Sequence, residues 1–327
     1  MNQPTLTAPT SAGESFHASP SHFISIADWS RPKIDEVLRF SAGIKRNPEQ
    51  YLHALEGRVL LMMFQKPSLR TRVSFESAMA RLGGHAIAYD LATSPWGHGR
   101  ETPADTAKTA SRYVDALMAR LFSHAEMLDL AAHATVPVIN GLTDLEHPCQ
   151  ALGDLLTLRE TFGHLEGLRV AYVGDACNNV THSLLDACSK MGIHLSIGCP
   201  SGKEYEPDVA VMARARTAAA ENGAHLEVVH DARLAVAGAD AVYTDTWMSY
   251  HIPAELRKLR ERILGPFRVT AALLANAKQE AVFMHSLPAW RGSELDAEVM
   301  DGPQSIVFCQ AENRLHTEKA LLLTLIH

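Results

Sequence analysis

Short apolar runs alternate along this chain with longer segments whose apolar residues recur at helical spacing. Runs at residues 59–64, 86–89, 116–119 and 136–140 have the length of buried strands. Helical patterns lie between them, as in the segment from Thr102 to Tyr113. Such an alternation predicts a parallel sheet with helices on both of its faces.

The same alternation starts again near residue 168, which indicates a second unit of the same class. Further strands are expected at residues 168–174, 194–197, 226–229, 241–244 and 281–284. Most of the predicted strands end directly before a polar cluster, and ligands of open parallel sheets bind beyond the carboxyl ends of strands. We therefore predict an α/β protein with two domains, each a mostly parallel sheet flanked by helices. Its active site is expected in the cleft between the domains.

Composition narrows the class of partner. The chain has 327 residues, of which 46% are hydrophobic and 20% charged, as is typical of soluble globular proteins. A net charge of −7 argues against nucleic acid as a partner, although a local arginine cluster can still bind a small anion. No stretch approaches the ~18 consecutive apolar residues of a membrane-spanning helix, so no membrane partner is expected.

The cysteines and the N-terminal segment indicate the compartment. Five cysteines, an odd number with no C-x-x-C pair, predict neither a disulfide framework nor a zinc site. The first twenty residues are rich in Ser, Thr, Pro and Ala and lack the basic start and apolar centre of a secretory signal. We expect a disordered tail over residues 1–22, and a reduced, cytoplasmic protein.

Two nucleotide-binding patterns are missing. The predicted strand that ends at Gly174 continues as Gly-Asp-Ala-Cys-Asn-Asn, which has one glycine instead of G-x-G-x-x-G. A nicotinamide or flavin site is therefore not expected, and the sequence also lacks the P-loop pattern G-x-x-x-x-G-K-[ST]. We predict no cofactor.

The run from residue 64 to residue 76 has the composition of an anion site. It follows a predicted strand and opens a predicted helix, where backbone N–H groups and the helix dipole favour a negative charge. Ser68 and Thr71 add hydroxyl groups, and Arg70 and Arg72 add planar guanidinium groups suited to phosphate. These residue types together predict a phosphate-binding turn.

Six segments, in the same order, resemble the motifs of the aspartate and ornithine carbamoyltransferase family. The resemblance runs from about residue 23 to the C-terminus, and the last three segments resemble the ornithine branch. The segments are Ser68-Leu69-Arg70-Thr71-Arg72, Arg120 after Ala116-Leu117-Met118-Ala119, His147-Pro148-Cys149-Gln150, Asp245-Thr246-Trp247-Met248-Ser249, His285-Ser286-Leu287-Pro288-Ala289 and Glu312-Asn313-Arg314-Leu315-His316.

The resemblance implies transfer of the carbamoyl group of carbamoyl phosphate to an amine, which needs neither metal nor cofactor. It places Thr71, Arg120 and His147 around the carbonyl oxygen, where preorganised donors stabilise developing negative charge. The predicted carbamoyl-phosphate contacts are Ser68, Leu69, Arg70, Thr71, Arg120, His147, Gln150, Leu287 and Arg314. The predicted catalytic residues are Arg70, Arg120, His147, Asp245 and Ser286.

The acceptor side departs from the family pattern. The resemblance implies acceptor binding by Asn179, Asp245, Ser249 and Tyr250. Tyr250 and His251 stand where the ornithine branch has Met-Gly, and Ser286 stands where that branch has Cys. A serine hydroxyl does not titrate near neutrality, so Ser286 cannot supply a thiolate beside the attacking amine.

A second departure lies in the loop from Ser94 to Glu101, which carries Trp96 and His98. In family trimers this loop reaches the active site of a neighbouring subunit, so the resemblance implies that Trp96 and His98 line a neighbour's site. An exposed glycine-rich loop is the competing interpretation. A bulky Trp in this region also occurs in branches that carbamoylate acylated ornithines.

Three hypotheses follow. The first is an ornithine carbamoyltransferase that makes citrulline and phosphate as a homotrimer; the second is a carbamoyltransferase for an N-acylated ornithine or a diamine. The third is a catalytically silent regulatory or structural paralogue, which losses among the phosphate-side residues would favour. The implied domains are a carbamoyl-phosphate-binding domain at 23–162, an acceptor domain at 163–303, and a C-terminal helix at 304–327 that returns to the first domain. The helical pattern itself is predicted to run from about Glu312 to Ile326.

Overall fold

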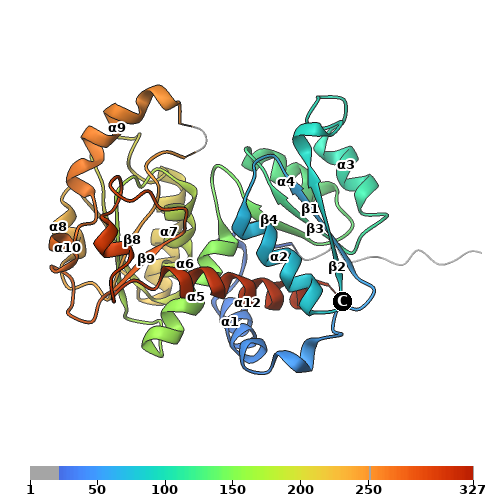
Figure 1. Ribbon diagram of the computed structural model, residues 1–327, viewed down its shortest axis with the longest axis horizontal. Coiled ribbons are helices and arrows are strands. Elements are labelled where there is room, and N and C mark those ends of the chain that lie inside the picture. The colour runs from blue at the N-terminus through green and yellow to red at the C-terminus, as the bar shows by residue number, and fades with distance from the viewer. Residues whose placement is uncertain (1–21, 250–251, 327) are drawn as a thin grey trace, which may run out of the picture.

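The computed structural model describes residues 22–249 and 252–326, which form two parallel β-sheets (Figure 1). The first sheet has the strand order β2-β1-β3-β4, and the second has the order β7-β6-β5-β8-β9. The strands are β1 (Val59–Phe64), β2 (His85–Asp90), β3 (Ala116–Arg120), β4 (Val138–Leu142), β5 (Arg169–Val173), β6 (His194–Gly198), β7 (Leu226–Val229), β8 (Ala241–Thr244) and β9 (Val282–His285). The prediction of two α/β units with parallel sheets is confirmed.

The principal helices pack on both faces of each sheet. They are α1 (Arg31–Arg46), α2 (Leu69–Arg81), α3 (Pro103–Ala110), α4 (His124–His133), α5 (Pro148–Phe162), α6 (Asn179–Met191), α7 (Val209–Asn222), α8 (Ala232–Val236), α9 (Arg257–Leu264), α10 (Ala271–Leu274), α11 (Ala297–Met300) and α12 (Val307–Leu325). Helices α3 and α4 cover one face of the first sheet, while α2 packs on the other. In the second sheet α6 and α7 cover one face, and α8, α10 and α11 cover the other.

Local sequence determines where several of these helices begin and end. The Ser68 hydroxyl accepts a hydrogen bond from the Thr71 N–H at the start of α2. The Asn178 side chain caps the first turn of α6 in the same way. Gly163, with φ +80°, ends α5 in the left-handed conformation that glycine adopts at no steric cost.

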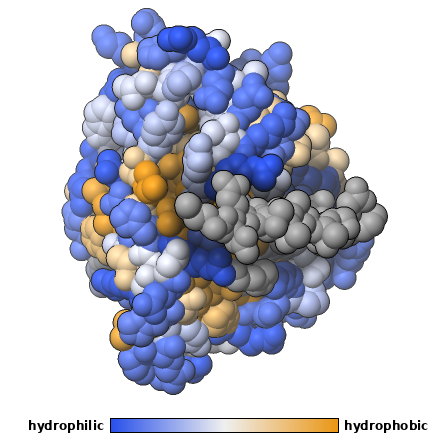
Figure 2. Space-filling view, turned by 90° about the vertical axis from the view of Figure 1, so that its right-hand side faces the viewer, coloured by the Kyte–Doolittle hydropathy of each residue, from blue (hydrophilic) through white to orange (hydrophobic). Residues whose placement is uncertain are grey.

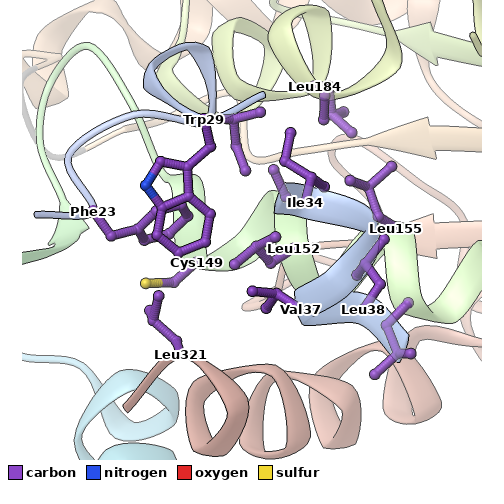
Figure 3. Packing of buried hydrophobic residues seen from close by; sticks show 14 of the residues in the cluster. Phe23, Trp29, Ile34, Val37, Leu38, Cys149, Leu152, Leu155, Leu184 and Leu321 are labelled. Atoms are coloured by element: carbon purple, nitrogen blue, oxygen red, sulfur yellow. The ribbon is translucent and has the colours of Figure 1, made fainter. Parts of the chain in front are cut away.

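One apolar core joins the two sheets. Figure 3 shows Ile34 and Val37 of α1, Leu152 of α5 and Leu321 of α12 converging on one volume. Helix α12 lies against α1, α2 and α5, although it follows the last strand of the second sheet (Figure 1). Because each fully buried aliphatic side chain contributes about 1.5–3 kcal/mol, this junction holds the two units in a defined relative position.

Two predicted helices differ in their limits. The helix expected over residues 102–113 spans Pro103–Ala110, with Thr102 as its cap. The last helix begins at Val307, five residues before the predicted start, and no side chain caps it. Its first turn is stabilised instead by tertiary contacts, since Val307 is buried and the Gln310 amide reaches β8 and α5.

The predicted tail over residues 1–22 lies outside the described residues, apart from His22. The His22 ring nitrogen Nδ1 accepts a hydrogen bond from the Val138 N–H, so the chain is already attached to β4 at this point. The domain limits at 162/163 and 303/304 stay predictions. Across residues 22–249 and 252–326, no helix is both long enough and apolar enough to cross a membrane.

Candidate active site

A cleft of about 580 Å³ opens at the carboxyl ends of the two sheets. Residues that follow β1, β8 and β9 line it, as does Arg120 at the end of β3. The cleft brings together ten of the predicted site residues: Ser68, Arg70, Arg120, His147, Asn179, Asp245, Ser249, Ser286, Leu287 and Arg314. The expectation that polar clusters after successive strands meet at one crevice therefore holds for these residues.

The first-sheet end of the cleft is built on the N-terminus of α2. Ser68 and Arg70 line it, and Thr71 is buried directly behind them. Arg314 reaches this turn from α12, where its Nη2 donates to the Thr71 hydroxyl at 3.1 Å. A side chain at Gly153 of α5 would place its Cβ 3.1 Å from the Arg314 Cγ, so this glycine leaves room for the guanidinium to approach. The result is a cationic turn suited to a phosphate group.

Two residues of the predicted phosphate motif contribute no side chain to the cleft. The Arg72 guanidinium donates to Glu76 one helical turn later, on the exposed side of α2, and does not line the cleft. The prediction that Arg72 adds a second guanidinium to the anion site is wrong. The Leu69 side chain is 75% exposed and is absent from the cleft wall, so only its backbone remains available for the predicted phosphate contact.

Arg120 and His147 lie together in the cleft wall. Strand β3 ends at Arg120, whose carbonyl accepts a hydrogen bond from the Gln65 N–H after β1. His147 precedes α5, and its backbone N–H donates to the Ser183 hydroxyl of α6 at 2.8 Å. Burial, followed by the charges of Arg314, Arg120, Arg70 and Lys66, holds the pKa of His147 well below its usual range. The imidazole is therefore neutral and can donate one ring N–H to a ligand oxygen.

Gln150 lies behind the wall of the cleft. Its Nε2 donates to Asp154 at 2.9 Å, which fixes the orientation of the side-chain amide. Its Oε1 is buried and has no hydrogen-bond partner among residues 22–249 and 252–326. An unpaired carbonyl oxygen at this position suits the predicted contact with the NH₂ of a carbamoyl group, because a buried acceptor is costly to leave unsatisfied.

Lys66 is a cleft residue that the sequence analysis missed. It follows β1, lines the cleft, and places its ammonium nitrogen 4.7 Å from the centroid of the Phe122 ring. Burial and the nearby Arg120 charge lower the pKa of Lys66 to about 8, against the opposing effect of Asp144. In the sequence, only the position of Lys66 between the predicted strand and the Ser68 turn could have indicated that it lines the cleft.

Asp245 and Ser286 form the reactive end of the second-sheet wall. They follow the neighbouring strands β8 and β9, and the Ser286 hydroxyl donates to Asp245 Oδ1 at 2.5 Å. Burial raises the pKa of Asp245, while the neighbouring His285 and Ser286 lower it. Behind this pair, His285 Nδ1 accepts from the Leu287 N–H at 2.8 Å, which fixes the turn that presents Leu287 to the cleft.

The other predicted acceptor residues have separate positions. Asn179 lines the cleft and donates through Nδ2 to the Thr143 carbonyl of the first unit at 2.6 Å. Ser249 also lines the cleft. The predicted roles of Tyr250 and His251 fall outside the described residues.

Trp96 and His98 do not lie in the cleft of their own chain. The Trp96 indole is 6% exposed and packs with Leu91 and Ala107 inside the first unit. Its predicted role in a neighbour's site stays a prediction. His98 is exposed, so its contribution to a neighbour's site stays a prediction. In the described part of the chain no group of three or more His, Cys, Asp or Glu side chains could hold a metal ion.

The arrangement defines a class of enzyme. A cationic turn that suits a phosphate faces a buried carboxylate that suits an amine, across a cleft between two α/β units. Such a site can hold an activated phosphate compound and an amine acceptor for group transfer.

Comparison with known proteins identifies the family. The carbamoyl-P binding domain of aspartate/ornithine carbamoyltransferase matches residues 21–160, and the Asp/Orn binding domain matches residues 166–325. The chain belongs to the aspartate/ornithine carbamoyltransferase family and is a carbamoyltransferase.

The similar proteins include curated relatives and solved structures. An ornithine carbamoyltransferase of Symbiobacterium thermophilum is 51% identical over 311 residues, covering 92% of this chain and 96% of the relative. The ornithine carbamoyltransferase structure from Pyrococcus furiosus superposes with a TM-score of 0.89 at 45% identity, covering 94% of this chain and 97% of that one. An acetylornithine transcarbamylase structure with acetylcitrulline has a TM-score of 0.84 at 32% identity, with 94% and 99% covered.

Proposed function

We propose that this protein transfers the carbamoyl group of carbamoyl phosphate to the side-chain amine of L-ornithine, giving L-citrulline and phosphate. One observation carries the proposal: the Asp245–Ser286 pair stands in the same cleft as Ser68, Arg70 and Arg314. An amine held by the carboxylate then lies beside a carbamoyl group held by the cationic turn. The relatives at 43–52% identity that bear the name ornithine carbamoyltransferase support the choice of acceptor.

In this proposal the phosphate of carbamoyl phosphate binds at the α2 N-terminus. Ser68, Arg70 and the backbone of the turn hold its oxygens, and Arg314 and Lys66 add positive charge nearby. Neutralising the phosphate weakens the bond between the carbonyl carbon and the bridging oxygen, because negative charge builds on that oxygen as it leaves.

The carbonyl oxygen lies towards Thr71, Arg120 and His147. As the neutral amine attacks the carbonyl carbon, this oxygen becomes an oxyanion. A guanidinium and one imidazole N–H are donors already oriented there, and such preorganised donors contribute about 3–4 kcal/mol each in comparable sites. Collapse of the tetrahedral intermediate breaks the bond to phosphate, which leaves as the dianion.

Asp245 performs the acceptor-side step. Its carboxylate binds the cationic amine and orients it, and the amine must lose one proton before it attacks. A second amine proton passes to the departing phosphate, so one ornithine cation and one carbamoyl phosphate give citrulline, hydrogen phosphate and one proton. The Ser286 hydroxyl donates to Oδ1 of Asp245, beside the position proposed for the amine.

A second candidate acceptor is an N-acylated ornithine. It is favoured by the similarity to the acetylornithine transcarbamylase structure and by the Ser286, Tyr250 and His251 departures from the ornithine pattern. A diamine fits less well, because Asn179 and Ser249 would then face no α-amino or carboxylate group. The silent-paralogue hypothesis has no support among the phosphate-side residues, which are all present.

The homotrimer is part of the proposal. A second hollow of about 350 Å³ lies over the edge strand β2, lined by Ile87, Tyr89, Trp96 and Tyr113. Figure 2 shows apolar side chains gathered on this face of the first unit, which is turned away from the cleft. An apolar face beside an edge strand suits a second copy of the chain. Sedimentation showing a fully active monomer at assay concentration would defeat this part of the proposal.

A reducing, cytoplasmic location completes the proposal. All five cysteines, which lie at residues 149, 177, 188, 199 and 309, carry free thiols. Free thiols are the usual state of cysteines in the cytosol.

A panel of acceptors tests the proposed function. Phosphate release from carbamoyl phosphate is followed with ornithine, acetylornithine, succinylornithine, putrescine, lysine and aspartate. We expect the highest kcat/KM for ornithine. A higher kcat/KM for acetylornithine or succinylornithine would make an N-acylated ornithine the acceptor. Phosphate release that no amine accelerates would contradict both candidates.

A further inference from the structure

Trp290 is an exposed aromatic side chain in the wall of the catalytic cleft. It lies five residues after the end of β9, and 53% of its surface is exposed. The family motifs do not include it, and the proposed chemistry does not use it. A large apolar side chain left half exposed at a ligand cleft commonly marks a contact surface for the ligand.

The indole is held by a residue from another element. The guanidinium of Arg257, the first residue of α9, lies 4.0 Å from the centroid of the Trp290 ring. Arg257 follows the segment after β8 that carries Met248 and Ser249 into the cleft. The contact therefore joins the polypeptide after β8 to the polypeptide after β9, and both segments line the acceptor side.

The backbone around Trp290 is also fixed. Its N–H donates to Glu294 at 2.5 Å, and the next residue, Arg291, makes two hydrogen bonds to Asp301. Glu294 is 1% exposed, so the backbone is tied to the protein interior. Because its backbone and one ring face are both fixed, the indole forms a rigid wall instead of a mobile side chain.

We propose that Trp290, held by Arg257, is a specificity-determining residue that narrows the acceptor end of the cleft and selects an unsubstituted α-amino acid over an N-acylated one. The inference rests on the proposed function. Met248, Ser249 and Trp290 line the same cleft as Asp245, so we infer that the rest of an acceptor whose amine is held by Asp245 lies against them. An acyl group adds bulk at the far end of the acceptor, where the fixed ring reduces the width.

The charge of Arg257 also favours an amino-acid acceptor with a free carboxylate. The guanidinium is half-buried behind the ring, and a cation at this end attracts the carboxylate of an amino acid. It repels the second ammonium group of a diamine. The ring and the guanidinium together therefore disfavour both alternatives to ornithine.

The test is the ratio of kcat/KM for ornithine to kcat/KM for N-acetylornithine, measured in the full-length enzyme. In Trp290→Ala we expect the ratio to fall at least about tenfold, since a pocket changed by a few apolar groups alters discrimination by roughly 10–200-fold. Trp290→Phe keeps an aromatic wall and should stay within about threefold of the wild type. The KM for carbamoyl phosphate should change little in either variant, because it binds at the opposite wall.

Two further variants complete the test. Leu234→Ala removes a side chain that is 66% exposed on α8 and remote from the cleft, and it should leave the ratio unchanged. Arg257→Gln removes the stacked cation and should lower the ratio in the same direction as Trp290→Ala, which keeps the test open if the alanine variant is unstable.

The outcomes separate the inference from the proposed function. A wild type that prefers ornithine, with ratios unchanged in both Trp290→Ala and Arg257→Gln, overturns the role of Trp290 alone. A wild type that prefers N-acetylornithine overturns the proposed acceptor and, with it, the direction of the selection.

Discussion

At the scale of single residues, the neutral imidazole of His147 beside three arginines defines the chemistry of the cleft. Burial and, after it, the charges of these arginines lower the pKa of His147, so the histidine serves as a hydrogen-bond donor and not as an acid. Arg120 supplies the charge and His147 supplies a directed N–H. Both act on the oxygen that becomes negative during attack.

Removing either donor should slow the chemical step. We expect His147→Ala or Arg120→Ala to lower kcat by about 10²–10³-fold for any acceptor, the usual effect of losing one oxyanion donor. Steady-state kinetics with saturating substrates measure the change. Arg120→Lys is the matched control: it keeps the charge and loses the planar fork, and it should recover only part of the rate. A variant with near-normal turnover would exclude that residue from the mechanism.

Lys66 gives the phosphate side a dependence on pH. Its pKa of about 8 means that its positive charge is present below this pH and is lost above it. We expect the KM for carbamoyl phosphate to rise as the pH passes from 7 to 9. In Lys66→Met the KM should be at least about tenfold higher at pH 7, ~1.4 kcal/mol, and should vary less with pH.

Lys66→Arg is the control for that profile, since a guanidinium stays charged across the range. This variant should keep a low KM at pH 9. If the KM for carbamoyl phosphate depends on pH in Lys66→Met as it does in the wild type, a group other than Lys66 titrates.

Lys66 and Arg72 also illustrate what a motif can predict. The sequence placed a phosphate site in the turn after β1 from Ser68, Arg70 and Thr71, and the structure has these residues there. Arg72 lies two positions beyond Arg70, about 200° around the helix, so it turns away to pair with Glu76. Helical geometry could have excluded it. Lys66 belongs to no periodic pattern, and only the folded turn places it in the cleft.

At the scale of elements, helices α5 and α12 share a buried carboxyl group that carries a stability prediction. Asp154 of α5 accepts hydrogen bonds from Gln150, Gln310 and Tyr243. Burial raises the pKa of Asp154 to about 7 despite these bonds. The folded protein therefore holds a proton that the unfolded chain releases above pH ~4.

This bound proton makes the folded state less stable as the pH rises. Because unfolding releases it, the stabilisation is complete below pH ~4 and is lost as the pH rises to about 7. Asp154→Asn replaces the protonated carboxyl by a neutral group of the same shape. Between pH 5 and pH 7 the free energy of unfolding of this variant should fall by about 2 kcal/mol less than that of the wild type, as measured by urea unfolding. An equal fall in both proteins would show that Asp154 is ionised in the native state.

The sequence predicted the presence of the strands and helices better than it predicted the residues at which they begin and end. Strand runs such as 86–89 were visible because apolar residues stand between turn signals, and β2 is found at His85–Asp90. The start of α12 was missed because no capping residue marks Val307 and tertiary packing extends the helix. The sequence did not predict the burial of the Trp96 side chain, because a glycine-rich loop gives no periodic signal for an inward-facing residue.

At the scale of the whole molecule, two parallel sheets present their carboxyl ends to one cleft, and a shared core holds them in place. The anion turn comes from the first sheet and the Asp245–Ser286 pair from the second. Neither unit contains both halves of the site. Transfer therefore depends on the relative position of the units, which α5 and α12 maintain across the junction shown in Figure 3.

The bond that forms tests this account most directly. The enzyme is mixed with ornithine and carbamoyl phosphate labelled with ¹³C at the carbonyl carbon, and the label is followed by NMR spectroscopy. The account predicts that the label moves into the ureido carbon of citrulline, one for each phosphate released, and that Asp245→Asn slows this transfer strongly while carbamoyl phosphate still binds. Labelled carbon appearing only as bicarbonate, or transfer at the wild-type rate in Asp245→Asn, would contradict it.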